Sequence, residues 1–169
     1  MTADFDLAAL YGAIDAQRPA RGLSWAAAVR DMSSPFSRNG SRPLAASTVT
    51  GFRTKPVAEG DRVLAMLRWL GRTPESFVPG SAVDGDAARL PAAGARVLRM
   101  DTRKLDEALN AARAARGLTW EQLAREIAGK TTNTLTGLAR NSRTGFPHVM
   151  RITAWLGQPL ARFTRATSR

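Results

Sequence analysis

The sequence predicts an all-α fold made of two tandem five-helix units joined by a linker. Three observations lead to this prediction. The chain repeats itself internally, its apolar residues recur at the spacing of amphipathic helices, and no segment alternates apolar and polar residues as a half-buried strand would. The 169 residues are enough for two small domains, and a hydrophobic content of 44% is enough to form a packed core.

The internal repeat is read directly from the sequence. Arg-Gly-Leu-Ser-Trp at 21–25 recurs as Arg-Gly-Leu-Thr-Trp at 116–120, an offset of 95 residues. Thr-Val-Thr-Gly-Phe at 48–52 matches Thr-Leu-Thr-Gly-Leu at 134–138, an offset of 86 that also relates Trp-Leu-Gly at 69–71 to 155–157. The offset falls because the first copy carries nine additional residues between the two matched blocks. We interpret the pattern as a duplication.

These matches predict the domain organisation. The first domain is expected at 1–78 with an insertion in a turn at about 33–45, and the second at 101–169, ending in a basic C-terminal tail. Residues 79–100 between them are rich in proline, glycine and small residues, a composition typical of a linker. An alternative stays open, in which Val97 and Leu98 pack on one domain as an extra element.

The second copy carries the clearer helix signals. Thr102 is expected to cap a first helix that ends at Gly117. Thr119 and Gln122 form the pattern of a capping box, so a second helix should run from 120 to about 128. After a break at Gly129, a third short helix capped by Thr131 should turn Leu135 and Leu138 inward.

The remaining helices of this copy follow the same logic. Val149, Ile152 and Trp155 form one apolar stripe, which predicts a fourth helix over about 146–156 that stops at Gly157. Pro159 should open a last short turn or helix that ends at Phe163.

Helices two and three carry a family resemblance. A small residue at Ala124, a turn glycine at Gly129, a cap at Thr131 and core anchors at Leu135 and Leu138 resemble the Cro/repressor (XRE-type, lambda-repressor-like) helix-turn-helix family. The resemblance covers about residues 101–163, and extends to 6–78 only through the internal repeat. It implies two tandem five-helix helix-turn-helix domains, each with a third helix that enters the DNA major groove. Lys130, Asn141 and the long insertion of the first copy depart from the family pattern.

The charge distribution also indicates a polyanionic partner. Lysine and arginine number 25 against 14 acidic residues, a formal net charge of +11. Two stretches lack acidic residues altogether, one between Asp31 and Glu59 and one after Glu126. Because the two runs occupy matching parts of the two copies, we expect two copies of one DNA-binding surface.

The outward face of each third helix should meet base edges, and flanking basic residues should meet phosphates. Arg38 and Arg42 in the insertion could reach a phosphate or the minor groove, although a tolerated surface loop is the alternative. Gly51 and Gly137 indicate either close approach to DNA or a tight helix contact. The expected DNA-binding residues are Arg38, Arg42, Ser47, Thr48, Thr50, Arg53 and Lys55 in the first copy, and Lys130, Thr132, Asn133, Thr136, Arg140 and Arg143 in the second.

Other function classes are poorly supported by the composition. The chain has no cysteine, a single histidine (His148), no glycine-rich phosphate loop and no grouped carboxylates at apolar sites. We therefore expect no catalysis, no metal and no cofactor. The absence of a long apolar stretch and of a signal-like N-terminus predicts a cytoplasmic protein that associates with the nucleoid when bound to DNA.

The sequence thus predicts a sequence-specific double-stranded DNA-binding transcriptional regulator, with repression as the expected sign, acting on two adjacent half-sites. A homodimer is left open, while a membrane partner and a small-molecule effector are not expected. Two alternatives stay open. One is a protein-interaction or antitoxin-type accessory factor with a single DNA-reading copy, and the other is an architectural protein that binds DNA without sequence preference.

Overall fold

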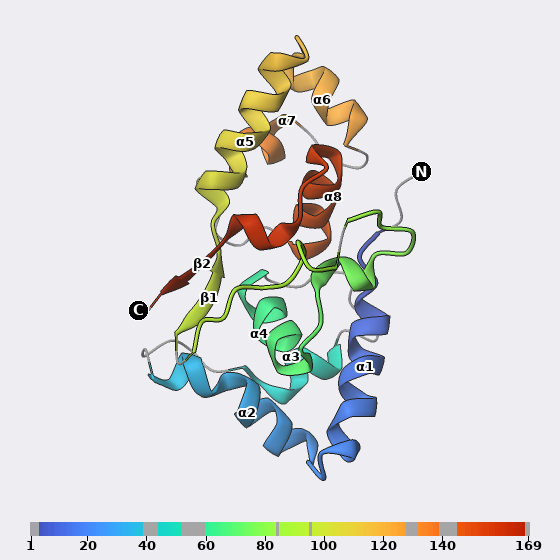
Figure 1. Ribbon diagram of the computed structural model, residues 1–169, viewed down its shortest axis with the longest axis vertical. Helices are drawn as coiled ribbons and strands as arrows, with labels where there is room; N and C mark the ends of the chain where they lie inside the picture. Colours follow the sequence, from blue (N-terminus) through green and yellow to red (C-terminus); the bar gives the residue numbers. More distant parts are fainter. Residues whose placement is uncertain are drawn as a thin grey trace.

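The computed structural model describes residues 4–38, 44–51, 60–83, 85–94, 96–127, 132–138 and 145–167, with the side chains of residues 37 and 38 excepted. Over these residues the protein is mostly helical, with eight α-helices, two 3-10 helices and one two-stranded sheet (Figure 1). The mainly α fold class predicted from the sequence is therefore observed.

The two halves of the chain repeat one order of elements. The first contains α1 (Leu7–Ala20), α2 (Trp25–Arg38), α3 (Ala46–Thr50), α4 (Gly60–Leu70) and the 3-10 helix η2 (Pro74–Phe77). The second contains α5 (Thr102–Ala115), α6 (Trp120–Glu126), α7 (Thr132–Thr136), α8 (Phe146–Leu156) and the 3-10 helix η4 (Leu160–Phe163). The last element of each copy, expected as a short turn or helix, is a single 3-10 turn.

Equivalent residues begin the first helix of each copy. The carboxylate of Asp6 accepts a hydrogen bond from the amide of Ala9 at 2.9 Å, and Asp101 accepts one from Lys104 at 3.0 Å. The expectation that Thr102 caps the second of these helices is wrong by one residue, because the side chain of Asp101 satisfies the free amide and Thr102 is already helical.

The other predicted helix ends of the second copy agree with the structure. Thr119 and Gln122 form both hydrogen bonds of the capping box, at 2.8 and 3.1 Å. Gly117 and Gly157 take left-handed φ values of +64° and +66°, which a residue with a side chain rarely adopts. Helix α8 spans the predicted range, whereas α6 ends at Glu126, before the expected end at about 128.

The expectation of a purely α-helical chain is wrong in one respect. Strand β1 (Val97–Met100) pairs antiparallel with β2 (Thr164–Thr167), in the register Val97 with Thr167 and Met100 with Thr164. Part of the expected linker and part of the expected C-terminal tail therefore form a sheet. Val97 and Leu98 are both buried, so the segment lacks the alternating pattern that reveals a half-buried strand.

The insertion of the first copy differs from the expected loop. Residues 33–38 continue α2, which is 14 residues long against seven for α6. Phe36 is buried on this extension, and the buried hydroxyl of Ser33 accepts a hydrogen bond from the amide of Leu44 at 3.0 Å. Burial of Phe36 provides an apolar anchor for the additional turns and compensates for Pro35 within the helix.

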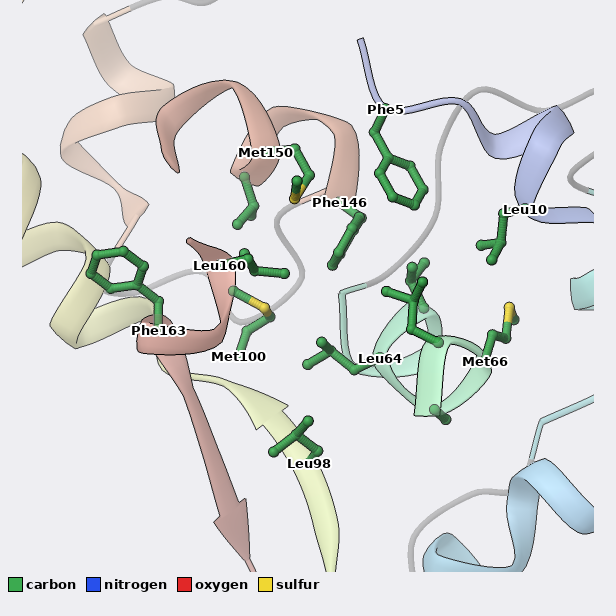
Figure 2. Close-up of a cluster of buried hydrophobic side chains, with 14 of the residues drawn as sticks. Phe5, Leu10, Leu64, Met66, Leu98, Met100, Phe146, Met150, Leu160 and Phe163 are labelled. Atoms are coloured by element: carbon green, nitrogen blue, oxygen red, sulfur yellow. The ribbon is translucent and has the colours of Figure 1, made fainter. Parts of the chain in front are cut away.

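The two copies share one hydrophobic core. Side chains of both copies are almost fully buried in the same cluster, namely Leu10, Ile14 and Leu64 of the first copy and Phe146 and Phe163 of the second. Figure 2 shows side chains from the N-terminal segment, α4, β1, α8 and η4 converging on this region. The two copies are therefore packed against each other, and the fold fixes their relative position.

Candidate nucleic-acid interface

The start of the second helix in each copy is held by an arginine from the first helix. In the second copy, Arg113 Nη1 donates to the carbonyl oxygen of Leu118 at 2.6 Å, and its guanidinium lies 4.8 Å from the ring centroid of Trp120. In the first copy, the equivalent Arg18 donates to the carbonyl of Leu23 at 3.0 Å and lies 5.0 Å from the ring of Trp25. The same two contacts orient α2 and α6 against α1 and α5.

A second pair of contacts ties the second helix to the fourth. The indole Nε1 of Trp155 donates to Glu126 at 2.7 Å, and the guanidinium of Arg116 lies 4.1 Å from the same indole ring. In the first copy Trp69 donates to Asp31 at 3.2 Å and Arg21 lies 4.2 Å from its ring. All four tryptophans are only partly buried, so Trp69 and Trp155 border the core and do not lie inside it.

The third helices rest on this frame through apolar anchors. Leu135 and Leu138 are fully buried, as expected from the sequence, and Val49 is fully buried at the matching position of α3. Leu123 and Ala124 of α6 are buried as well, and the small side chain of Ala124 leaves room for α7 to pack closely on α6. The anchors determine which residues of α3 and α7 face solvent.

Six of the predicted DNA-binding residues lie in the described part of the chain. Ser47 on α3 and Asn133 and Thr136 on α7 are exposed, and Thr48, Thr50 and Thr132 are half-buried. The backbone of Arg38 ends α2, but its side chain lies outside the described residues. So do the other predicted contacts, namely Arg42, Arg53, Lys55, Lys130, Arg140 and Arg143.

The threonines at the ends of the third helices are already engaged as donors. Thr136 Oγ1 donates to the carbonyl of Thr132 at 3.0 Å, and the equivalent Thr50 donates to Ala46 at 3.2 Å. A hydroxyl used in this way retains its acceptor lone pairs and its methyl group but offers no proton to a phosphate. Of the two roles expected for a threonine here, contact with a thymine methyl suits this geometry better than donation to phosphate.

Among the described residues, a Cβ at the shared glycine after each third helix would meet no other helix. A Cβ added to Gly51 would meet nothing within 4 Å, and one added to Gly137 would meet only the carbonyl of Asn133, at 3.0 Å. Of the two interpretations offered by the sequence, a tight helix contact therefore finds no support here.

Besides the supporting pair Arg18 and Arg113, sequence reasoning overlooked a matched pair of exposed cations on the second helices. Arg30 on α2 and Arg125 on α6 are both exposed and are related by the same offset of 95 residues. Arg125 pairs with Glu121 one turn earlier, at 2.7 Å, and both side chains are 72% exposed. The repeat offset of 95 residues is enough to identify this pair from the sequence, because it places both arginines at the equivalent position of the second helix in each copy.

Two further properties concern the described residues only. No group of three or more His, Asp or Glu side chains among them is placed to hold a metal ion. In the same part of the chain, no helix combines the length and apolar character needed to cross a membrane.

Comparisons with known proteins found no match among protein-family models, curated proteins or solved structures. The resemblance to the Cro/repressor family therefore depends on the motif residues alone.

Proposed function

We propose that this protein is a DNA-binding transcriptional regulator, with repression as its expected action, built from two tandem lambda-repressor-like helix-turn-helix domains. In this proposal α3 and α7 are the recognition helices and read bases in the major groove of double-stranded DNA. The protein is proposed to act without enzymatic activity, in the cytoplasm and on the nucleoid.

One observation carries the proposal. Each copy holds its short third helix on buried anchors and exposes equivalent positions of that helix to solvent, Ser47 on α3 and Asn133 on α7. An exposed asparagine can pair bidentately with adenine, and a serine can hydrogen-bond to several bases. The net charge of +11 supplies the long-range attraction to phosphate that such a surface requires.

The test is selection of bound sites from randomised duplex DNA, followed by sequencing, with the full chain and two matched variants. We expect a bipartite motif from the wild-type chain. Asn133→Ala should relax one half of it, with a loss of about 1–3 kcal/mol of base discrimination, and Ser47→Ala should weaken preference in the other half by less. Lys104→Ala, which removes an exposed charge from α5, is the control and should leave the motif unchanged.

The outcomes separate the alternatives. If only Asn133→Ala alters the motif, the first copy does not read bases, and an accessory or antitoxin-type role with a protein partner becomes the better description. If selection enriches no sequence while binding persists and weakens steeply with salt, the protein is an architectural DNA binder. If no DNA binds at physiological salt, the proposed function is wrong.

A further inference from the structure

The packing between the two copies is reciprocal. Phe5, just before α1, places its ring 4.8 Å from that of Phe146, the first residue of α8. Met100, just before α5, lies against Gly60, the first residue of α4, so closely that a Cβ on the glycine would be 2.7 Å from its Cγ. Phe5 corresponds to Met100 in the repeat, and Phe146 corresponds to Gly60. Each copy therefore contacts the other with the same surface.

Each copy also makes a polar contact with the fourth helix of the other copy, and the acidic and basic partners are exchanged between the two contacts. Arg151 of α8 donates twice to Asp4, at 2.6 and 2.7 Å. Asp61 of α4 accepts from Arg99 at 3.0 Å and from the backbone amide of Met100 at 2.8 Å. Asp4 and Arg99 occupy one position of the repeat, and in both cases the partner lies in the other copy's fourth helix, Arg151 at the centre of α8 and Asp61 at the start of α4.

A third contact joins two elements that are equivalent to each other in the repeat. The carboxylate of Glu75, in η2, accepts a hydrogen bond from the amide of Leu160, in η4, at 2.7 Å. These 3-10 helices correspond to each other in the repeat, as do α4 and α8, which also touch. An element that packs on its own equivalent lies beside a two-fold axis, whereas units related by translation bring unlike surfaces together.

The arrangement of the helices agrees with a two-fold relation. In Figure 1, α1 and α5 lie on opposite sides of the molecule and run in opposite directions along the page. Helices α2 and α6 occupy opposite ends, and α4 and α8 meet between them. Two copies related by translation would keep α1 and α5 parallel. The two-fold operation that exchanges α1 and α5 also exchanges α3 and α7.

We infer that one chain recognises two inverted half-sites of a single DNA segment at a fixed spacing, because the reciprocal interface around Phe5, Gly60, Met100 and Phe146 relates α3 and α7 by a two-fold axis. The backbone of duplex DNA has two-fold axes perpendicular to its length, and a two-fold protein matches them with inverted half-sites. The half-sites differ in sequence, since Ser47 stands where the second copy has Asn133. This inference rests on the proposed function and adds the geometry of the target.

The test uses the full chain and duplexes built from the two halves of the selected motif. One series joins them as inverted repeats and the other as direct repeats, with spacers varied one base pair at a time. Inverted repeats at one spacing should bind best, and a shift of half a helical turn, about 5 base pairs, should weaken binding about tenfold or more. Sedimentation should show one chain per duplex.

Weakening the interface should relax the spacing requirement. The two variants are Phe5→Ala and Asp4→Ala. The second removes only a partly exposed ion pair and leaves the core intact. In each variant, binding should tolerate other spacings while the half-site sequences stay the same. Equal binding of direct repeats, indifference of the wild-type chain to spacing, or two chains per duplex would overturn the two-fold inference and leave DNA recognition intact. Failure to select any motif would instead remove the proposed function, and the inference with it.

Discussion

The two copies of the repeat share the contacts that hold their helices together and differ in the parts of the helices that those contacts position. Arg18 and Arg113 hold the second helices in the same way, and Trp69 and Trp155 tie the second helices to the fourth. By contrast, α2 is twice as long as α6, with 14 residues against seven.

This difference locates the divergent parts of the molecule. After a duplication, contacts that position helices must be kept in both copies, whereas exposed residues of the third helix can change without loss of stability. Two copies with one frame and two different exposed faces are what a bipartite, asymmetric target would require. Among the described residues, the extension of α2 around Phe36 has no counterpart on α6, which ends at Glu126.

The largest expected effect tests whether the copies form one folding unit. Leu10 and Leu105 occupy one position of the repeat and are both fully buried. Leu10→Ala and Leu105→Ala should each lower the free energy of unfolding by about 2–5 kcal/mol. Because the copies share one core, urea unfolding followed by circular dichroism and by tryptophan fluorescence should give coincident single transitions.

Ala16→Ser and Ala111→Ser, at exposed equivalent positions of α1 and α5, are the controls and should change stability by less than about 0.5 kcal/mol. A variant in which one half melts while the other stays folded would show that the copies are independent domains.

A smaller effect should separate the two supporting arginines. Arg113 Nε donates to Asn110 at 3.2 Å, but Arg18 Nε is buried and has no hydrogen-bond partner among the described residues. Arg113→Met should therefore cost about 1–2 kcal/mol of unfolding free energy, and Arg18→Met measurably less. Arg103→Met, which removes an 86% exposed arginine, is the control and should be close to neutral. Equal costs at positions 18 and 113 would mean that the ion pair of Arg18 with Asp15, at 3.1 Å, offsets the penalty of the unpaired Nε.

Local signals made most of the helices predictable. The capping box at Thr119, the glycine at Gly157 and the apolar stripe through Val149 and Ile152 act within one or two turns, and α8 has the predicted bounds. The burial of Leu135 and Leu138 was also predictable, because helical spacing determines which side chains share a face. The exposed set on α3 and α7 follows from those anchors.

The sheet and the packing between copies depend on residues far apart in the sequence. Strand β1 pairs with a segment more than 60 residues away, and its own residues show no alternation. The sequence around Asp4 and Phe5 does not predict an interface, because their partners Arg151 and Phe146 lie far along the chain. The only local hint is that Phe5 and Met100 are both apolar and both precede a capping aspartate, Asp6 or Asp101.

The 3-10 helices offer a pH-dependent comparison, since Glu75 in η2 corresponds to Ala161 in η4. Burial raises the pKa of Glu75 above 4.5, outweighing the hydrogen bond from Leu160. A raised pKa in the folded state means that the contribution to stability is complete below about pH 4.5 and is lost as the pH rises through the folded-state pKa. We expect Glu75→Gln, which stays neutral, to be more stable than the wild type at pH 7 by about 1 kcal/mol or more, because burying an unpaired charge costs more than burying a neutral amide.

The measurement is urea unfolding of both chains from pH 4 to pH 8. The difference between them should vanish toward pH 4. Asp4→Asn is the control with the opposite sign. The hydrogen bond from Arg151 lowers the pKa of Asp4 below 3.8, so the contribution of the Asp4 carboxylate to stability is present above that pH and lost only below it. A Glu75→Gln variant that is less stable than the wild type at pH 7 would contradict the sign argued here.

The smallest effect concerns a position where the first copy is the weaker helix. Gly12 lies in the middle of α1, exposed, where the second copy has Glu107. A Cβ added at Gly12 would meet nothing within 4 Å, so Gly12→Ala should raise the free energy of unfolding by about 0.5–1 kcal/mol through helix propensity alone. The contrasting glycine is Gly60, where an added Cβ would press on Met100 at 2.7 Å, and Gly60→Ala should destabilise the chain. Thermal unfolding of both variants beside the wild type tests whether the interface between the copies, and not helix propensity, determines the effect at Gly60. Stabilisation by both substitutions would show that Met100 moves aside without cost and that the interface is less closely packed than the contact at Gly60 indicates.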